Sequence, residues 1–139
     1  MAWWRRCRAC PEGGCVNTPE VPRRSQTSMQ VSGQAGEDAA LAHLSRQGLT
    51  LVTRNFRCKA GEIDLIMREQ DCLVFIEVRQ RASRDFGGAA ASVTPAKQRR
   101  LLRATQYFLL RYKTLPPCRI DVVAIDGGNL TWLKNAIEA

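Results

Sequence analysis

Apolar and charged residues alternate along residues 61–67 and again along residues 73–79. A period of two is typical of β-strands, and the apolar pattern stops at residues 69–72, which predicts a tight turn there. In the first strand one face carries Ile63, Leu65 and Met67, and the other carries Glu62, Asp64 and Ile66. In the second strand one face carries Leu73, Phe75, Glu77 and Arg79, and the other carries Val74, Ile76 and Val78.

Two carboxylates are expected to meet on this hairpin. A turn centred on Gln70 and Asp71 sets Asp64 opposite Glu77, with Cβ atoms about 4.5–5.5 Å apart. Like charges repel in apolar surroundings, and Mg²⁺ or Mn²⁺, which prefer hard oxygen ligands, would compensate the repulsion. Arg79 shares the face of Glu77 and would stabilise charge on a phosphate. The pattern is that of a phosphodiester-cleaving metal site.

A plain edge hairpin with solvated charges would show the same alternation. A shift of register by one residue would also turn either carboxylate to the opposite face of the sheet. The hairpin alone therefore does not decide between these two interpretations.

The rest of the pattern predicts two helices and three further strands, which makes an α/β domain. Ser32 is the expected N-cap of the first helix, and Thr94, followed by Pro95, is the expected N-cap of the second. The helices are predicted at residues 33–47 and 95–113, and the strands at residues 49–57, 118–125 and 130–133.

Two polar side chains fall on the inner faces of these helices. Glu37 shares the apolar stripe of Ala40 and Leu41, so it is either a third ligand or water-positioning group, or a glutamate that favours the helix dipole. Gln98 could reach a metal-bound water or a phosphate, and helix capping is an equal alternative. Asp121, on the predicted strand 118–125, is expected to be structural.

The chain is basic, with a net charge of +8, and a polyanion such as nucleic acid is the partner that this charge favours. Nine Lys and Arg but one acid occur between Arg79 and Lys113, so the basic stretch begins at the carboxylates. A solvated, basic helix face is the alternative. The residues expected to contact the nucleic-acid backbone are Arg81, Arg84, Lys97, Arg99, Arg100 and Arg103.

Residues 1–31 have no apolar periodicity, and we expect a mobile basic arm there, followed by one domain at residues 32–139. No apolar run approaches the length of a membrane span, so no membrane partner is expected and a cytoplasmic location is assumed. Six cysteines lack the spacing of a zinc finger and are expected to be free thiols.

Several motifs together resemble the YraN-like family of small bacterial proteins, over about residues 33–135. They are Gly36-Glu37, Gly61-Glu62-Ile63-Asp64-Leu65-Ile66, Phe75-Ile76-Glu77-Val78-Arg79, Gly87-Gly88-Ala89-Ala90-Ala91-Ser92-Val93-Thr94, Lys97-Gln98 and Cys118-Arg119-Ile120-Asp121-Val122-Val123. The resemblance extends, more distantly, to archaeal Holliday-junction resolvases. It implies a restriction-endonuclease-like αβββαβ core with a central mixed sheet flanked by helices.

By this resemblance, Asp64 and Glu77 correspond to metal-binding carboxylates, Glu37 to a helix glutamate and Arg79 to the last residue of a Glu-x-Lys motif. Arginine stays protonated, so Arg79 can stabilise a phosphate but cannot accept a proton. Glu37 and Gln98 would position water, and symmetric homodimers are expected.

The leading hypothesis is a Mg²⁺- or Mn²⁺-dependent endonuclease on DNA, with branched or damaged DNA as the substrates considered. The alternatives are a non-catalytic nucleic-acid-binding protein that keeps the nuclease fold, and a module that binds an acidic protein.

Overall fold

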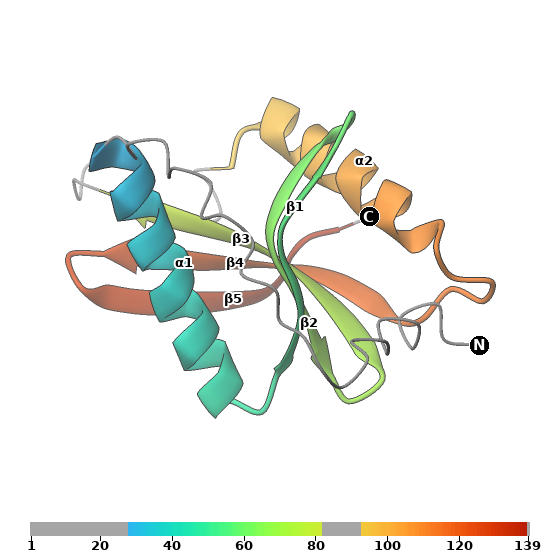
Figure 1. Ribbon diagram of the computed structural model, residues 1–139, viewed down its shortest axis with the longest axis horizontal. Coiled ribbons are helices and arrows are strands. Elements are labelled where there is room, and N and C mark those ends of the chain that lie inside the picture. Colours follow the sequence, from blue (N-terminus) through green and yellow to red (C-terminus); the bar gives the residue numbers. More distant parts are fainter. Residues whose placement is uncertain (1–27, 82–92, 139) are drawn as a thin grey trace, which may run out of the picture.

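The computed structural model describes residues 28–81 and 93–138 (Figure 1). Two helices and five strands follow one another in the predicted αβββαβ order, with a further strand at the end. They are α1 (Ser28–Arg46), β1 (Thr50–Cys58), β2 (Gly61–Glu69), β3 (Cys72–Arg81), α2 (Pro95–Leu109), β4 (Cys118–Asp126) and β5 (Asn129–Ile137). The restriction-endonuclease-like α/β class predicted from the sequence is confirmed.

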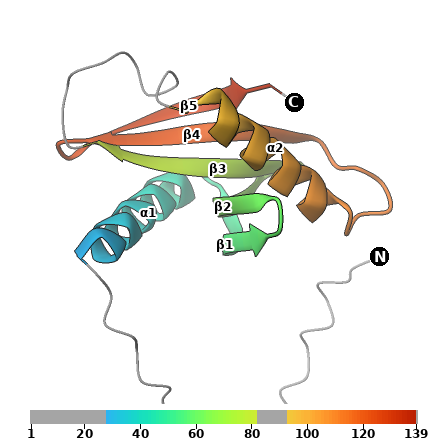
Figure 2. The ribbon, with the colours of Figure 1, turned by 90° about the horizontal axis from the view of Figure 1, so that it is seen from above.

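The five strands form one mixed sheet in the order β1-β2-β3-β4-β5, in which β3 and β4 are parallel and the other neighbours are antiparallel. Helices α1 and α2 lie on opposite faces of the sheet (Figure 2). Because parallel neighbours need a crossover, α2 carries the chain from the end of β3 back to the start of β4. Neither helix in the described residues is long and apolar enough to cross a membrane.

Each face of the sheet has its own apolar core. On the α1 side, Leu44 packs with strand residues that include Leu65 and Ile76. On the α2 side, the Phe108 ring meets the rings of Phe56 and Phe75 edge-on, with centroids 5.2 and 5.7 Å apart. Burial of each such side chain stabilises the fold by roughly 1.5–3 kcal/mol. Both helices are therefore anchored to the same central strands, β2 and β3.

The hairpin register is the predicted one. Leu65 pairs with Ile76 and Ile66 with Phe75, around a turn at which Gln70 takes a φ of 54°. The paired positions end at Leu65 and Ile76, one step before Asp64 and Glu77. Beyond that step β2 pairs only with β1, and β3 pairs only with β4. We call this divergence of β2 from β3, at Asp64 and Glu77, the fork.

One predicted face assignment is wrong. Ile63 packs on the α2 side with Ile66, whereas Leu65 and Met67 pack on the α1 side. The alternation changes phase because Asn55 on β1, which would face Asp64, has a φ of 49° and is skipped in the β1–β2 pairing. A residue in the left-handed region interrupts the extended backbone, and with it the alternation of side chains between the two faces of the sheet.

Three predicted boundaries differ from the structure by four residues or more. Helix α1 starts at Ser28, so Ser32 lies inside it and residues 28–31 belong to the helix rather than to the predicted arm. Helix α2 ends at Leu109 instead of residue 113, because Arg111 and Tyr112 bond to carbonyls three residues back and tighten the chain into turns. Strand β5 runs to Ile137, past the predicted end at residue 133. The predicted arm up to residue 27 lies outside the described residues.

Candidate active site

The fork is held by a bond between a side chain and the neighbouring strand. The backbone N–H of Val78 donates to Asp64 Oδ2 over 2.8 Å, at the point where regular pairing of β2 with β3 has ended. The carboxylate thus replaces the backbone carbonyl that a continued ladder would provide. It also lies beside Glu77, the residue before Val78 on β3.

Glu77 is almost wholly buried, with 2% of its side chain exposed, and it faces α2. Lys97 Nζ on α2 lies 3.0 Å from Glu77 Oε1, and Arg79 Nε lies 3.8 Å from the same oxygen. The other oxygen, Oε2, is buried and has no hydrogen-bond partner within the described residues. Burial, together with the charge of Asp64, raises the pKa of Glu77 to about 7, and Lys97 opposes the rise.

The pKa of Asp64 is raised as well, mainly because the side chain is removed from water. The Val78 N–H and the charge of Lys97 act in the opposite direction. One lysine therefore interacts with both carboxylates of the fork. Acidic groups whose environments shift their pKa values toward neutrality, next to a basic group, are typical of catalytic and metal-binding sites.

Lys97 was predicted to contact nucleic-acid backbone, and its contact with Glu77 was missed. Thr94 caps α2 as predicted, since its hydroxyl accepts the Lys97 backbone N–H over 3.2 Å. Lys97 consequently lies in the first turn, where a positive charge opposes the helix dipole. That unfavourable placement favours an anionic partner for Lys97 but does not identify Glu77 as that partner.

Glu37 approaches the fork from α1. Its side chain is 16% exposed, and its pKa is raised first by burial and then by the charge of Asp64. Asn55 hydrogen-bonds the carboxylate and lowers the pKa, as does Arg54, whose guanidinium is 4.0 Å away. Gly36 allows this approach, because a Cβ there would lie only 3.2 Å from Gln80 Oε1.

The described residues contain no group of three or more His, Cys, Asp and Glu side chains that could hold a metal ion. Glu37 is thus within electrostatic reach of Asp64 without completing a three-carboxylate ligand set. Of the residues predicted to be catalytic, Asp64, Glu77 and Arg79 lie together at the fork. Lys97, which is predicted only to contact nucleic acid, lies there as well.

Gln98 is engaged elsewhere on α2. Its side-chain N–H donates to the Val93 carbonyl over 3.0 Å, which ties the start of the helix to the preceding residues. This contact matches the capping alternative, and a role in positioning water stays a prediction. Arg99, Arg100 and Arg103 are exposed on α2. The side chain of Arg81 and all of Arg84 lie outside the described residues.

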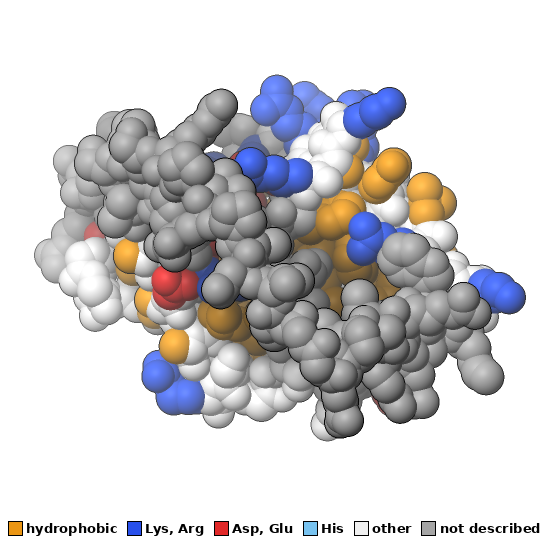
Figure 3. Space-filling view, viewed as in Figure 1, with side chains coloured by type: hydrophobic (Ala, Val, Ile, Leu, Met, Phe, Trp, Pro, Cys, Tyr) orange, Lys and Arg blue, Asp and Glu red, His pale blue; other side chains and the backbone are white. Residues whose placement is uncertain are grey.

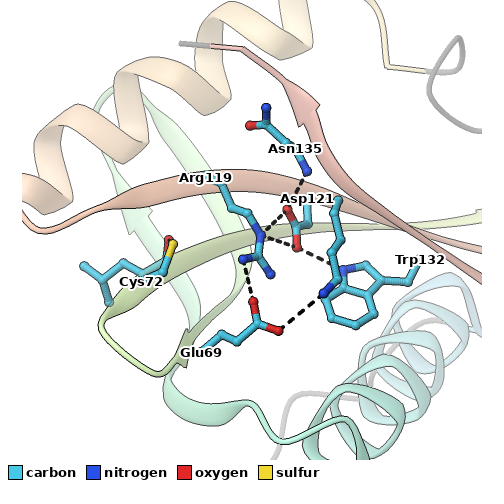
Figure 4. A network of polar contacts seen from close by, with 8 residues as sticks. Glu69, Cys72, Arg119, Asp121, Trp132 and Asn135 are labelled. Carbon is cyan, nitrogen blue, oxygen red and sulfur yellow. Dashed lines mark hydrogen bonds and ion pairs between the residues drawn. The ribbon is translucent and has the colours of Figure 1, made fainter.

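A second polar cluster surrounds Asp121, which is fully buried (Figure 4). Its carboxylate accepts the Asn135 backbone N–H over 2.8 Å and the Trp132 indole N–H over 2.9 Å, and Arg119 Nε lies 3.0 Å from Oδ1. Arg119 also binds Glu69 at the β2–β3 turn. Every partner of Asp121 named here is a fixed protein group, so this cluster joins β2, β4 and β5, in agreement with the predicted structural role.

Comparisons with known proteins give the family. The sequence profile of uncharacterised protein family UPF0102 matches residues 36–125. The chain belongs to this family. A UPF0102 protein of Herminiimonas arsenicoxydans is 59% identical over 124 residues, which cover 89% of this chain and 100% of that protein. UPF0102 proteins of Janthinobacterium sp. (strain Marseille) and Cupriavidus metallidurans are 60% and 58% identical, over 84% and 85% of this chain and 94% and 89% of their own lengths.

UPF0102 is the YraN-like family that the sequence motifs resemble, so that prediction is confirmed. The matched range includes Glu37, Asp64, Glu77 and Lys97, as well as all of β1 to α2. The names of the relatives give the family and no reaction.

Proposed function

We propose that this UPF0102 protein is a metal-dependent endonuclease that hydrolyses phosphodiester bonds in DNA. The observation that carries the proposal is the fork, where Asp64 and Glu77 approach each other from two diverging strands and share Lys97. Two acids beside one lysine are the groups that such a reaction needs. The acids bind a cation, and the lysine stabilises charge near the phosphate.

The residues present fit Mg²⁺ or Mn²⁺. Glu77 Oε2 is a buried oxygen with no hydrogen-bond partner in the described part of the chain, and such an oxygen is costly unless a cation or donor meets it. Asp64 and Glu77 would be the ligands, with the Val78 carbonyl as a further oxygen. Two carboxylates suffice, because Mg²⁺ usually keeps several waters. When bound, the ion would lower the pKa of an attached water and polarise the phosphate.

In a Glu-x-Lys motif the lysine supplies a positive charge beside the carboxylates. This chain has Arg79 at that position, and Lys97 supplies the ammonium instead. Arg79 lies 3.8 Å from Glu77 Oε1, and its guanidinium is a fixed cation. The Lys97 ammonium lies closer, at 3.0 Å, and 27% of its side chain is exposed toward solvent. We therefore assign to Lys97 the role of holding Glu77 and a substrate phosphate, and to Arg79 an auxiliary electrostatic role.

DNA is the proposed polymer, with branched and damaged forms as the substrates to test first. The exposed Arg99, Arg100 and Arg103 on α2 flank Lys97 and would neutralise backbone phosphates. A homodimer, expected from the resemblance to resolvases, would match the two-fold symmetry of a four-way junction.

The experiment is a cleavage assay on a labelled four-way junction and a matched duplex, each with Mg²⁺ and with Mn²⁺. Wild type is compared with Asp64→Asn and Glu77→Gln, which keep the shape of each side chain. Cleavage by wild type that both substitutions abolish would support the proposal, and the ratio of junction to duplex cleavage would define the substrate. DNA binding without cleavage in either metal would overturn it and leave a nucleic-acid-binding protein.

A further inference from the structure

A groove of about 260 Å³ lies between the β1–β2 turn and the first half of α2. Its lining residues are Arg57, Cys58, Gly61, Glu62, Lys97, Arg100 and Leu101. Lys97 is the residue that the groove shares with the fork, because its ammonium contacts Glu77. One side chain thus separates the groove from the two carboxylates.

The lining carries three cations and one anion. Glu62 is 3.5 Å from Arg57 Nε and is offset by it, and Lys97 is paired with Glu77, which leaves the positive charge of Arg100 in excess within this lining. Arg57, Glu62 and Arg100 are exposed. Figure 3 shows Lys and Arg side chains gathered along the upper edge of the molecule, where Figure 1 places the β1–β2 turn and the start of α2.

The backbone fixes the shape of this groove. A Cβ on Gly61 would lie 3.1 Å from the Arg100 carbonyl oxygen and 3.3 Å from the Arg100 Cβ, so the first residue of β2 touches the helix directly. Leu101, which is buried in the α2-side core, anchors the helix beneath this contact. The cations are consequently held at the rim of a preformed concavity rather than on a free loop.

The chemistry of the lining identifies the class of ligand. A pocket for a whole small molecule usually measures about 300–1,000 Å³, whereas this groove is smaller and has charged residues at four of its seven lining positions. The lining has no aromatic side chain on which a base could stack. Arginine and lysine on a concave surface instead match the charge and oxygen geometry of phosphate.

We propose that this groove binds a backbone phosphate of the nucleic acid, next to the phosphate that lies at the fork. The inference rests on the proposed function for the position of the second phosphate, and Lys97 bridges the two positions. Arg100 and Arg57 are the binding residues, and Glu62 limits the affinity.

The test measures binding of a labelled DNA duplex by fluorescence anisotropy in EDTA, over a series of salt concentrations, so that no cleavage is required. Arg57→Ala combined with Arg100→Ala is compared with Arg46→Ala combined with Lys113→Ala, which removes the same charge from exposed sites elsewhere. We expect the groove variant to lose roughly tenfold or more in affinity, and the slope of log affinity against log salt concentration to decrease by about one phosphate contact. The control should change less than threefold.

A substitution of opposite sign sharpens the test. Glu62→Gln removes the anion of the groove and releases Arg57, so it should tighten binding about two- to fivefold. Asp71→Asn, at the exposed β2–β3 turn, changes the net charge equally and should have a smaller effect.

Equal losses in the two double variants, unchanged binding in the groove variant, or no DNA binding by wild type would each overturn the inference. Groove-dependent binding by a wild type that cleaves nothing would uphold the inference while overturning the proposed endonuclease.

Discussion

The Lys97 ammonium on α2 lies 3.0 Å from Glu77 Oε1 on β3, on the same face of the sheet as Arg79. In a Glu-x-Lys motif the positive charge comes from the motif lysine, and we assign that charge to Lys97 here. The charge should therefore still support cleavage when it is moved from position 97 to position 79. Lys97→Met should reduce cleavage about a hundredfold, and Arg79→Lys added to it should restore at least about a tenth of the wild-type rate.

The Lys97→Arg substitution is the matched control, because it keeps the charge and lacks the compact ammonium. It should restore less activity than the relocated lysine does. Full activity of Lys97→Met, or no recovery in the double variant while its melting temperature equals that of wild type, would contradict this role.

Binding of a metal ion at the fork should depend on pH. Because the pKa of Glu77 is raised to about 7 by burial and by Asp64, a cation must displace a proton from this carboxylate below neutrality. Mn²⁺ affinity, followed by the loss of the free-ion electron paramagnetic resonance signal, should rise about tenfold per pH unit up to about pH 7 and then level off. Glu77→Gln should bind weakly with a flatter profile, whereas a pH-independent wild-type affinity would count against Glu77 as a ligand.

Without divalent cations, the same carboxylate should make folding less favourable as pH rises. The folded pKa of Glu77 is about 7, above its ordinary value of 4.5, so the folded state holds the proton more tightly. The stability contributed by this group is therefore complete below pH 4.5 and is lost as pH rises through about 7.

The glutamine in Glu77→Gln has no proton to lose over this range. The free energy of unfolding of this variant should therefore fall less than that of wild type between about pH 5 and 7.5. The difference should reach up to about 3 kcal/mol, since one pKa unit corresponds to roughly 1.4 kcal/mol. Urea titrations in EDTA at several pH values measure the difference. Glu138→Gln, at an exposed position, is the control and should track wild type. Parallel pH curves for wild type and Glu77→Gln would show that the burial of Glu77 is not linked to its protonation.

The Asp121 cluster should matter for stability and not for chemistry. Trp132→Phe removes the indole N–H that reaches Asp121 Oδ2 over 2.9 Å, and hydrogen bonds to charged groups contribute about 1.5–3 kcal/mol. The urea midpoint should fall accordingly, while the cleavage rate per folded molecule stays within about twofold. Tyr107→Phe, which alters an exposed ring, is the control. A selective loss of cleavage in a stable Trp132→Phe protein would mean that the cluster takes part in the reaction.

The sequence was sufficient for the hairpin because the apolar pattern stops only at residues 69–72, and a turn centred there sets the register that brings Asp64 toward Glu77. It was also sufficient for the start of α2, where Thr94 and Pro95 are strong local signals. It could not predict the contact of Lys97 with Glu77, because that contact depends on how α2 crosses the sheet. Nor did the alternation reveal the change of phase at Asn55, which moves Ile63 to the α2 side.

The central claim is that Asp64 and Glu77 form one metal-dependent catalytic site. The most direct measurement is the Mn²⁺-dependent cleavage rate of wild type, Asp64→Asn and Glu77→Gln, purified identically and shown to be folded, with Asp126→Asn as a control away from the fork. We predict a wild-type rate that EDTA abolishes, a loss of about a hundredfold or more in each fork variant, and little change in the control. Cleavage that survives both fork substitutions, or a wild type that binds DNA and never cleaves it, would contradict the claim.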